Sequence, residues 1–361
     1  MHQAAATASA ILARQRTFTG WMWLAPFAAA PFYPYALDRF HNAYVGAHAM
    51  GPMAWLYLLA AYAIPALGLL FAWRLGAAAP QDLGPARLRA ARLAQLVVAA
   101  PPMFTLLGVL LYLMKIAGHD GAVWLGLWCA FALGAALVTL TAGEQGRALA
   151  TMPLAPADDP HRHALLRAAH GISAVLLLAV FLLPHLFNHL AGLGGLELHR
   201  AIMKTLRLLY RNGFVEPLLI GIFFFQIISG LVLYRRKSAS SRDLLDVLQT
   251  SSGVYLSIYI AGHINSVFTL ARYFGTETDF AWAVGAPVGL LADPWDIRLL
   301  PHYSLAVLFL IAHLAGATRL VLRKHGAPAR RADGAAWCIV LLGLLLSGAI
   351  TAAMLGYTVF R

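Results

Sequence analysis

The chain has 361 residues, of which 60% are hydrophobic and 12% are charged, and its mean hydropathy is +0.70. Globular domains carry roughly 25% charged residues, so this composition excludes a soluble enzyme, a disordered chain and a free-standing nucleic-acid-binding protein, and it indicates an integral protein of the lipid bilayer. The 27 Lys and Arg exceed the 15 Asp and Glu by 12, a surplus that we interpret as membrane topology rather than as affinity for nucleic acid.

Nine apolar runs approach the length of about 20 residues that a helix needs to cross a bilayer. They cover residues 20–37, 51–73, 93–114, 121–142, 168–192, 213–234, 252–274, 303–322 and 336–360. The sequence therefore predicts an all-α, polytopic membrane protein with about nine transmembrane helices. The first run is the weakest because three prolines interrupt it, and a cleaved signal peptide over residues 1–30 is the alternative interpretation.

The basic residues between the runs predict the orientation. With the N-terminus in the cytoplasm, the inner segments carry 17 Lys and Arg and the outer segments carry nine. This asymmetry follows the positive-inside rule and favours a bacterial-type inner membrane, with the C-terminus outside. One outer loop breaks the rule, because residues 195–211 contain four basic side chains.

A long polar connection, residues 143–167, divides the chain into two parts. Residues 1–150 form a four-helix transmembrane region, and residues 165–361 form a five-helix bundle. The apolar runs of the first part contain no Asp, Glu, Arg or His near their middles, so this part offers no evident site. Its role is left open by the sequence.

Histidines distinguish the second part. Ionisable side chains within a membrane are costly, and they mark function by default. Two neutral imidazoles from different helices, at similar depth, can hold a six-coordinate haem b. The runs place His185 and His263 at similar depths, and we expect these two to bind one haem iron. His189 is the rival to His185, whereas His170 lies too near the inner face to share that haem. The alternative is that such histidines only form polar hydrogen bonds between helices.

The exceptional outer loop offers cations for the haem propionates. His199, Arg200, Lys204, Arg207 and Arg211 follow one another at helical spacing. A haem near the outer face would place its carboxylates close to these side chains. An amphipathic helix that rests on lipid headgroups is the alternative interpretation of the segment.

Residues 165–360 resemble the five-helix cytochrome b membrane anchor of succinate dehydrogenases and fumarate reductases. The motifs that carry the resemblance come in the family's order: Phe181-Leu-Leu-Pro-His185-Leu-Phe-Asn-His189, Glu216-Pro217 with Phe225-Gln226-Ile-Ile-Ser-Gly230, Ser252-Gly253 with Gly262-His263, and Ile311-Ala-His313-Leu-Ala-Gly316. Residues 1–150 lie outside the resemblance.

The family pairs its first haem histidine with its third and its second with its fourth. The resemblance therefore implies that His185 and His263 hold the outer haem. Gln226 stands where the second histidine is expected, and glutamine is a poor ligand for haem iron. The resemblance thus implies one haem b and leaves the inner one in doubt, with His313 free to hydrogen-bond Gln226.

These expectations describe a haem b protein that passes electrons to or from a quinone, as a respiratory anchor subunit or as a stand-alone cytochrome. With only two cysteines and no dinucleotide fingerprint, the chain would need a soluble flavin and iron–sulfur partner, or other membrane subunits, to supply further redox centres. The expected sources of quinone contacts are the Glu216-Pro217 pair and the outer loop 275–302, which contains Asp279, Trp282, Trp295, Asp296, Arg298 and His302. An interfacial aromatic belt with solvated charges is the alternative interpretation of this loop. The alternatives are a transporter or sensor that works without electron flow, and a structural assembly subunit.

Overall fold

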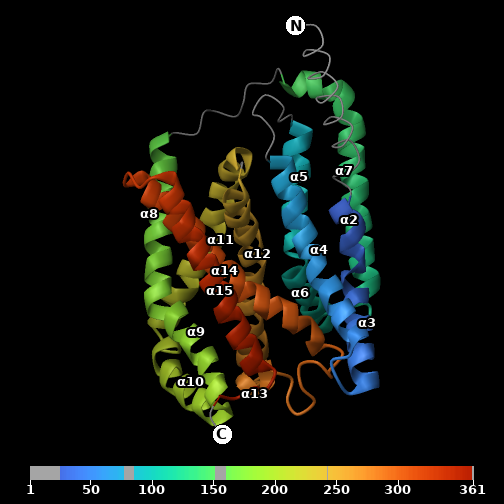
Figure 1. Ribbon diagram of the computed structural model, residues 1–361, viewed down its shortest axis with the longest axis vertical. Helices are drawn as coiled ribbons and strands as arrows, with labels where there is room; N and C mark the ends of the chain where they lie inside the picture. The colour runs from blue at the N-terminus through green and yellow to red at the C-terminus, as the bar shows by residue number, and fades with distance from the viewer. Residues whose placement is uncertain (1–24, 77–84, 151–159, 242, 360–361) are drawn as a thin grey trace.

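The computed structural model describes residues 25–76, 85–150, 160–241 and 243–359, and all the regular secondary structure in these residues is helical, without strands. Figure 1 shows two groups of helices side by side, α2 to α7 in one and α8 to α15 in the other. The first group comprises α2 (Ala25–Ala29), η1 (Ala30–Phe32), α3 (Tyr33–Ala47), α4 (Pro52–Gly76), α5 (Pro85–Val98), α6 (Ala100–Leu113) and α7 (Asp120–Ala150).

The second group carries all the histidines that the sequence singles out within apolar runs. It comprises α8 (Pro160–Leu177), η3 (Leu178–Leu182), α9 (Leu183–Leu190), η4 (Ala191–Gly194), α10 (Leu196–Tyr210), α11 (Val215–Ser240), α12 (Leu244–Ser266), η5 (Val267–Tyr273), α13 (Phe280–Ala283), η6 (Asp296–Arg298), α14 (Leu299–Lys324) and α15 (Ala329–Met354). Helices α10 and α13 lie at one end of the molecule (Figure 1), which we call the α10 end.

Six stretches in the described residues are long and apolar enough to cross a membrane. They are Pro52–Gly76, His161–Gly194, Val215–Ser240, Leu244–Tyr273, Asp296–Lys324 and Ala329–Met354. A seventh span results if α5 and α6, which meet at an angle of 63°, are taken together. Large apolar side chains on these helices face outward, as lipid contact requires; Ile172, for example, is 72% exposed. The membrane character that the composition predicts is therefore confirmed, while the count of nine is not.

Prolines account for the differences from the predicted runs. The run 93–114 is divided at Ala99 because Pro101 and Pro102, which open α6, lack the N–H groups that would continue the α5 ladder. The run 20–37 corresponds to the short helices α2 and η1 and the start of α3, and its first residues lie outside the described part of the chain, as does most of the alternative signal peptide. Helix α7 covers the run 121–142, but its apolar part, Asp120–Gly134, is shorter than the candidate spans.

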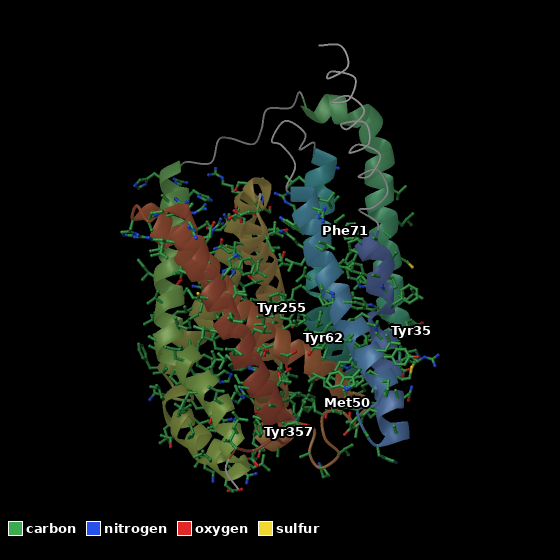
Figure 2. The ribbon with its side chains drawn as sticks, in the orientation of Figure 1. Tyr35, Met50, Tyr62, Phe71, Tyr255 and Tyr357 are labelled. Atoms are coloured by element: carbon green, nitrogen blue, oxygen red, sulfur yellow. The ribbon has the colours of Figure 1, made fainter. Side chains whose placement is uncertain are left out.

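The two groups share one apolar core. Buried side chains from both groups, such as Tyr33 and Phe104 from the first and Phe280 and Ile350 from the second, belong to the same cluster. Helix α12 packs against both α5 and α6. Figure 2 shows Tyr62 and Tyr255 in the middle of the molecule, where the Tyr62 hydroxyl lies 2.6 Å from Ser304 Oγ of α14. Polar and apolar contacts thus fix the first group against the helices that carry the histidines.

Candidate functional site: a histidine pair in a membrane cavity

Two irregular helices carry the central histidines, His185 in α9 and His263 in α12. Pro184 cannot donate a hydrogen bond to the preceding turn, and the π-helical segment η3 lies directly before α9. A second π-helical segment, η5, begins four residues after His263. Single π-helical turns inside α-helices often occur at functional sites, since they rotate the side chains that follow them.

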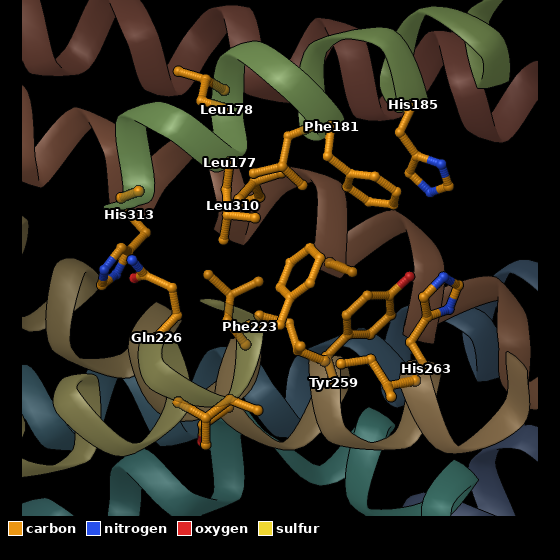
Figure 3. Close-up of a pocket in the computed structure, with 18 of the residues that line it drawn as sticks. Leu177, Leu178, Phe181, His185, Phe223, Gln226, Tyr259, His263, Leu310 and His313 are labelled. Carbon is orange, nitrogen blue, oxygen red and sulfur yellow. The ribbon is translucent and has the colours of Figure 1, made fainter. Parts of the chain in front are cut away.

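The rings of His185 and His263 face each other across a gap. Their centroids lie 6.2 Å apart and their planes are inclined by 67°. Figure 3 shows a ring nitrogen of each turned toward the other. A metal–imidazole bond is about 2 Å long and a ring nitrogen lies roughly 1.2 Å from its centroid, so two imidazoles on opposite sides of one metal have centroids roughly 6.4 Å apart. The observed separation fits a bis-imidazole iron.

His189 lies one turn beyond His185 on the same face. Its Nε2 atom is 3.3 Å from Nε2 of His185, and the two ring centroids are 4.6 Å apart. Nδ1 of His189 is buried without a hydrogen-bond partner. His189 is therefore either a hydrogen-bond partner of His185 or its rival for the same ligand, and the geometry leaves both roles open.

Aromatic rings frame the pair. Phe181 stacks on His185 at 5.0 Å between centroids, and Tyr259 stacks on His263 at 5.5 Å. On its other side, Tyr259 contacts the ring of His302 at 4.6 Å. Flat apolar surfaces of this kind suit a flat aromatic ligand. Neither Tyr259 nor the stacking role of Phe181 was expected from the sequence, because aromatic residues are frequent throughout the chain.

The histidine pair lies in a cavity of about 1550 Å³ that runs between α8, α9, α11, α12 and α14. This volume exceeds the 300–1,000 Å³ that is usual for a small-molecule pocket. Among the described residues of the first group of helices, only Thr105, Leu106 and Val109 line the cavity. Among the described residues there is no cluster of three or more His, Cys, Asp or Glu that could hold a metal ion by itself. Any metal would thus need further ligands, which a porphyrin supplies.

The predicted basic segment forms α10, but its cations divide into two sets. Arg200 pairs with Glu197 at 2.8 Å and with Asp279 at 3.1 Å, and Lys204 is exposed, so neither lines the cavity. Arg207 and Arg211, farther along the segment, do line it. A third arginine of the cavity wall, Arg272 in η5, pairs with Glu216 of α11. The α10 end of the cavity is therefore positively charged.

His199 is buried on the inner face of α10, only 2% exposed, and contacts the ring of Phe280 at 4.4 Å. Asn188 Nδ2 donates to its Nε2 at 3.2 Å. Burial lowers the pKa of His199 to about 4, with Arg207 acting in the same direction and the carboxylate of Asp279 opposing it. The imidazole is thus neutral at pH 7 and can hydrogen-bond a ligand carboxylate through its unpartnered Nδ1–H.

His313 and Gln226 lie toward the opposite end of the same cavity (Figure 3). The hydrogen bond expected between them is replaced by others. Gln226 Nε2 donates to the carbonyl oxygen of His170 at 2.9 Å and to Ser173 Oγ at 2.7 Å. Nδ1 of His313 lies 3.0 Å from the carbonyl oxygen of Gln249.

Only some of the residues expected to contact a quinone line the cavity. The side chains that line the cavity are Glu216, Asp279, Trp282, Trp295 and His302. Arg298 instead forms a buried ion pair with Asp120 of α7 at 2.7 Å, so its charge is satisfied by the first group. Burial opposes ionisation of Asp279, but the Trp282 N–H and the Arg200 guanidinium lower the pKa of this carboxyl below its ordinary value.

Comparisons with protein-family models, with curated proteins and with solved structures find no match to this chain. The case for its function rests on the geometry above.

Proposed function

We propose that this protein is a membrane cytochrome that holds haem b between His185 and His263 and exchanges electrons with a quinone. The observation that carries the proposal is the separation of the two rings, 6.2 Å between centroids, across one cavity and from two different candidate spans. A hydrogen bond between lone polar side chains, the alternative for intramembrane histidines, does not require this spacing. The resemblance of residues 165–360 to the cytochrome b anchors supports the same assignment.

The chain's own groups suit a dianionic porphyrin. His185 and His263 would bind the iron, and Phe181 and Tyr259 would pack beside the macrocycle. Arg207 and Arg211 lie at the end of the cavity where carboxylates would need cations. When bound, the group would supply one-electron exchange, and ligation by two imidazoles would leave the iron no site for a further ligand.

His302 is our candidate for quinone contact. It lines the cavity, and its ring lies against Tyr259, which stacks on His263, so a headgroup at this position would lie close to the proposed haem. A quinone needs a proton donor or acceptor at each carbonyl, which an imidazole provides. We propose further that the protein lies in a bacterial-type inner membrane with the α10 end outside, and that a flavin and iron–sulfur subunit is its soluble partner.

The test is the haem content and the reduced-minus-oxidised spectrum of the purified full chain, produced with ample haem supply. Wild type should show the sharp bands of a low-spin b-type haem. His185→Ala and His263→Ala should each lose the haem bound at this pair, because one imidazole cannot hold a six-coordinate iron. His325→Ala, an exposed histidine beyond the end of α14, is the matched control and should keep the full haem content.

Reduction of the wild-type haem by duroquinol, followed in a stopped-flow instrument, tests the quinone part, and it should slow in His302→Ala without loss of haem. A colourless wild-type preparation would overturn the haem assignment. Full haem in either variant of the pair would overturn the ligand assignment, and loss in His189→Ala with retention in His185→Ala would transfer the role to His189.

A further inference from the structure

The cavity has an opening on its side, between α8 and α14. Apolar residues of both helices line the cavity and are also exposed on the surface: Ile172 and Val175 of α8, and Leu320 and Val321 of α14. Val175 is 66% exposed and Val321 is 54% exposed. A side chain that both lines a cavity and is exposed lies at the edge of an opening. Because both helices belong to candidate spans, this lateral opening faces the acyl chains of the bilayer rather than water.

Each edge of the lateral opening is followed by a basic residue toward the end of the molecule opposite α10 (Figure 1). Arg167 precedes Ile172 by five residues on α8, and Lys324 follows Val321 by three residues and ends α14. At 1.5 Å per residue, each cation lies roughly 4–8 Å along its helix from the apolar edge. Both side chains line the cavity and are exposed. Since they lie near the ends of their spans, we place them at the depth of the lipid headgroups.

The charged side chains that line this end of the cavity are basic. Arg236 of α11 joins Arg167 and Lys324 there, whereas the acidic residues among the described lining residues, Glu216 and Asp279, lie toward the α10 end. The aspartates described near the opposite end pair with other cations and do not line the cavity: Asp243, Asp246 and Asp333. The lateral opening therefore offers positive charge to an anionic headgroup.

The interior of the cavity behind the lateral opening suits an apolar chain. Its polar side chains Gln226, His170 and His313 each have a hydrogen-bonding partner in the protein. A hydrocarbon chain beside them would leave those hydrogen bonds intact. Between these groups and His185, Figure 3 shows a wall of leucines: Leu177, Leu178 and Leu310.

We propose that the lateral opening binds one phospholipid with an anionic headgroup. Its phosphate lies between Arg167 and Lys324, and one of its acyl chains enters the cavity between α8 and α14. Basic pockets between membrane helices on the cytoplasmic side bind headgroups of this kind, and the orientation proposed above places this end there. The inference goes beyond the proposed function and requires neither haem nor quinone.

The size of the cavity allows both occupants. Its volume of about 1550 Å³ is above the range that is usual for one small ligand, so a chain behind the lateral opening leaves room for a group at the histidine pair. The bound chain would close the opening and give α8 an apolar neighbour on the side of α14. The lipid is thus a structural ligand of the helices that carry His185 and His263.

The test is native mass spectrometry of the purified full chain in a non-ionic detergent. The chain is titrated with palmitoyl-oleoyl phosphatidylglycerol and, separately, with the phosphatidylcholine of the same acyl chains. Wild type should retain one phosphatidylglycerol at concentrations at which it retains no phosphatidylcholine. Arg167→Ser combined with Lys324→Ser should weaken this binding roughly 30-fold, because each basic side chain near an anionic headgroup contributes about a factor of five. The matched control combines Arg330→Ser with Arg331→Ser, two exposed arginines of α15 that do not line the cavity, and should bind as wild type does.

Gly171→Trp tests the acyl chain separately from the headgroup. Gly171 of α8 lines the cavity, and a Cβ atom there would meet nothing within 4 Å. The indole should occupy the place of the chain and remove the bound lipid although both cations remain. Gly221→Trp in α11 is the control, because its Cβ would also lie in open space and it does not line the cavity. This variant should keep the lipid.

Equal binding of the two phospholipids by wild type would overturn the proposal, as would unchanged binding in the double variant of Arg167 and Lys324 or in Gly171→Trp. An equal loss of lipid in the control variants would show adsorption to the basic surface and would also overturn it. Recovery of an isoprenoid quinone that phosphatidylglycerol does not displace would assign the opening to another occupant. The haem content of every variant should match that of wild type, so failure of the haem assignment and failure of the lipid site are distinguishable.

Discussion

Gly108 of α6 controls a buried ion pair between the two groups of helices, and its replacement by alanine tests how that pair holds the fold. A Cβ atom at this position would collide with Nη1 of Arg298 and lie 3.0 Å from Oδ2 of Asp120. The two charged groups are 2.7 Å apart, and their side chains are 9% and 14% exposed. Arg298 also lies over the rings of Phe104 and Trp295. Alanine would therefore expel the guanidinium from a desolvated position.

The magnitude follows from two opposed effects. Breaking a buried ion pair costs about 3–5 kcal/mol, because a charge is left without its partner. Replacing glycine by alanine within a helix gains about 1 kcal/mol. We expect Gly108→Ala to lose about 2–4 kcal/mol of unfolding free energy, a factor of roughly 30–1,000 in the unfolding equilibrium. Gly126→Ala in α7, where a Cβ would meet nothing within 4 Å, is the control and should be neutral or slightly stabilising.

The assay is unfolding by sodium dodecyl sulfate in mixed micelles, followed by tryptophan fluorescence and far-ultraviolet circular dichroism. Repeating Gly108→Ala in an Asp120→Ala background should reduce its cost, since the pair is already lost. Equal stability of Gly108→Ala and wild type would refute the reasoning. The reasoning would also be refuted if Gly108→Ala lost the same unfolding free energy in the wild-type and Asp120→Ala backgrounds.

Two further predictions use the same unfolding assay. The pKa of His199 is lowered to about 4 in the fold, whereas an unfolded histidine binds its proton near pH 6.5. Stability should therefore fall as the pH drops from about 6.5 to 4, and the fall should shrink in His199→Gln; identical pH profiles would contradict this. Arg319 is 5% exposed and pairs with three aspartates. Because two of these carboxylates are partly solvated, Arg319→Met should lower the free energy of unfolding by about 1–3 kcal/mol. The exposed Arg323→Met should lower it by less than about 1 kcal/mol. Equal losses in the two variants would contradict the prediction.

Hydropathy predicted the membrane-spanning helices of the second part well, because lipid contact demands long apolar stretches whatever the tertiary contacts are. Their ends were less accessible. Helix α15 begins at Ala329, seven residues before the predicted run, and includes Arg330, Arg331 and Asp333. The carboxylate of Asp333 contacts Arg319 at 2.7 Å and Arg323 at 3.2 Å. Ion pairs between neighbouring helices thus extend the helices past their apolar parts. A single sequence contains no pattern that predicts which charged residues will pair.

The site was accessible only in part. Depth along two apolar runs was enough to single out His185 and His263, and the structure places their rings together; their role as ligands is still a prediction. The same arithmetic placed His170 near the inner face, too far from His263 to share one haem. Nothing in the sequence indicates that Ser229 Oγ lies 2.7 Å from Nδ1 of His170, or that Gly230 lies against the ring of His170 and Gly253 against the ring of His313. Those relations depend on how α8, α11, α12 and α14 pack.

Several polar side chains in the described helices of the first group contact the second group. Gln95 of α5 donates to Thr250 of α12 at 2.8 Å and accepts from Tyr234 of α11 at 2.5 Å. Tyr62 contacts Ser304 of α14 at 2.6 Å. Buried polar contacts of this kind fix one arrangement of helices, because each unmade bond leaves a polar group in an apolar surrounding. Helices α12 and α14 carry His263, His302 and His313, so the contribution of the first group is to hold these rings in register across the cavity rather than to supply ligands.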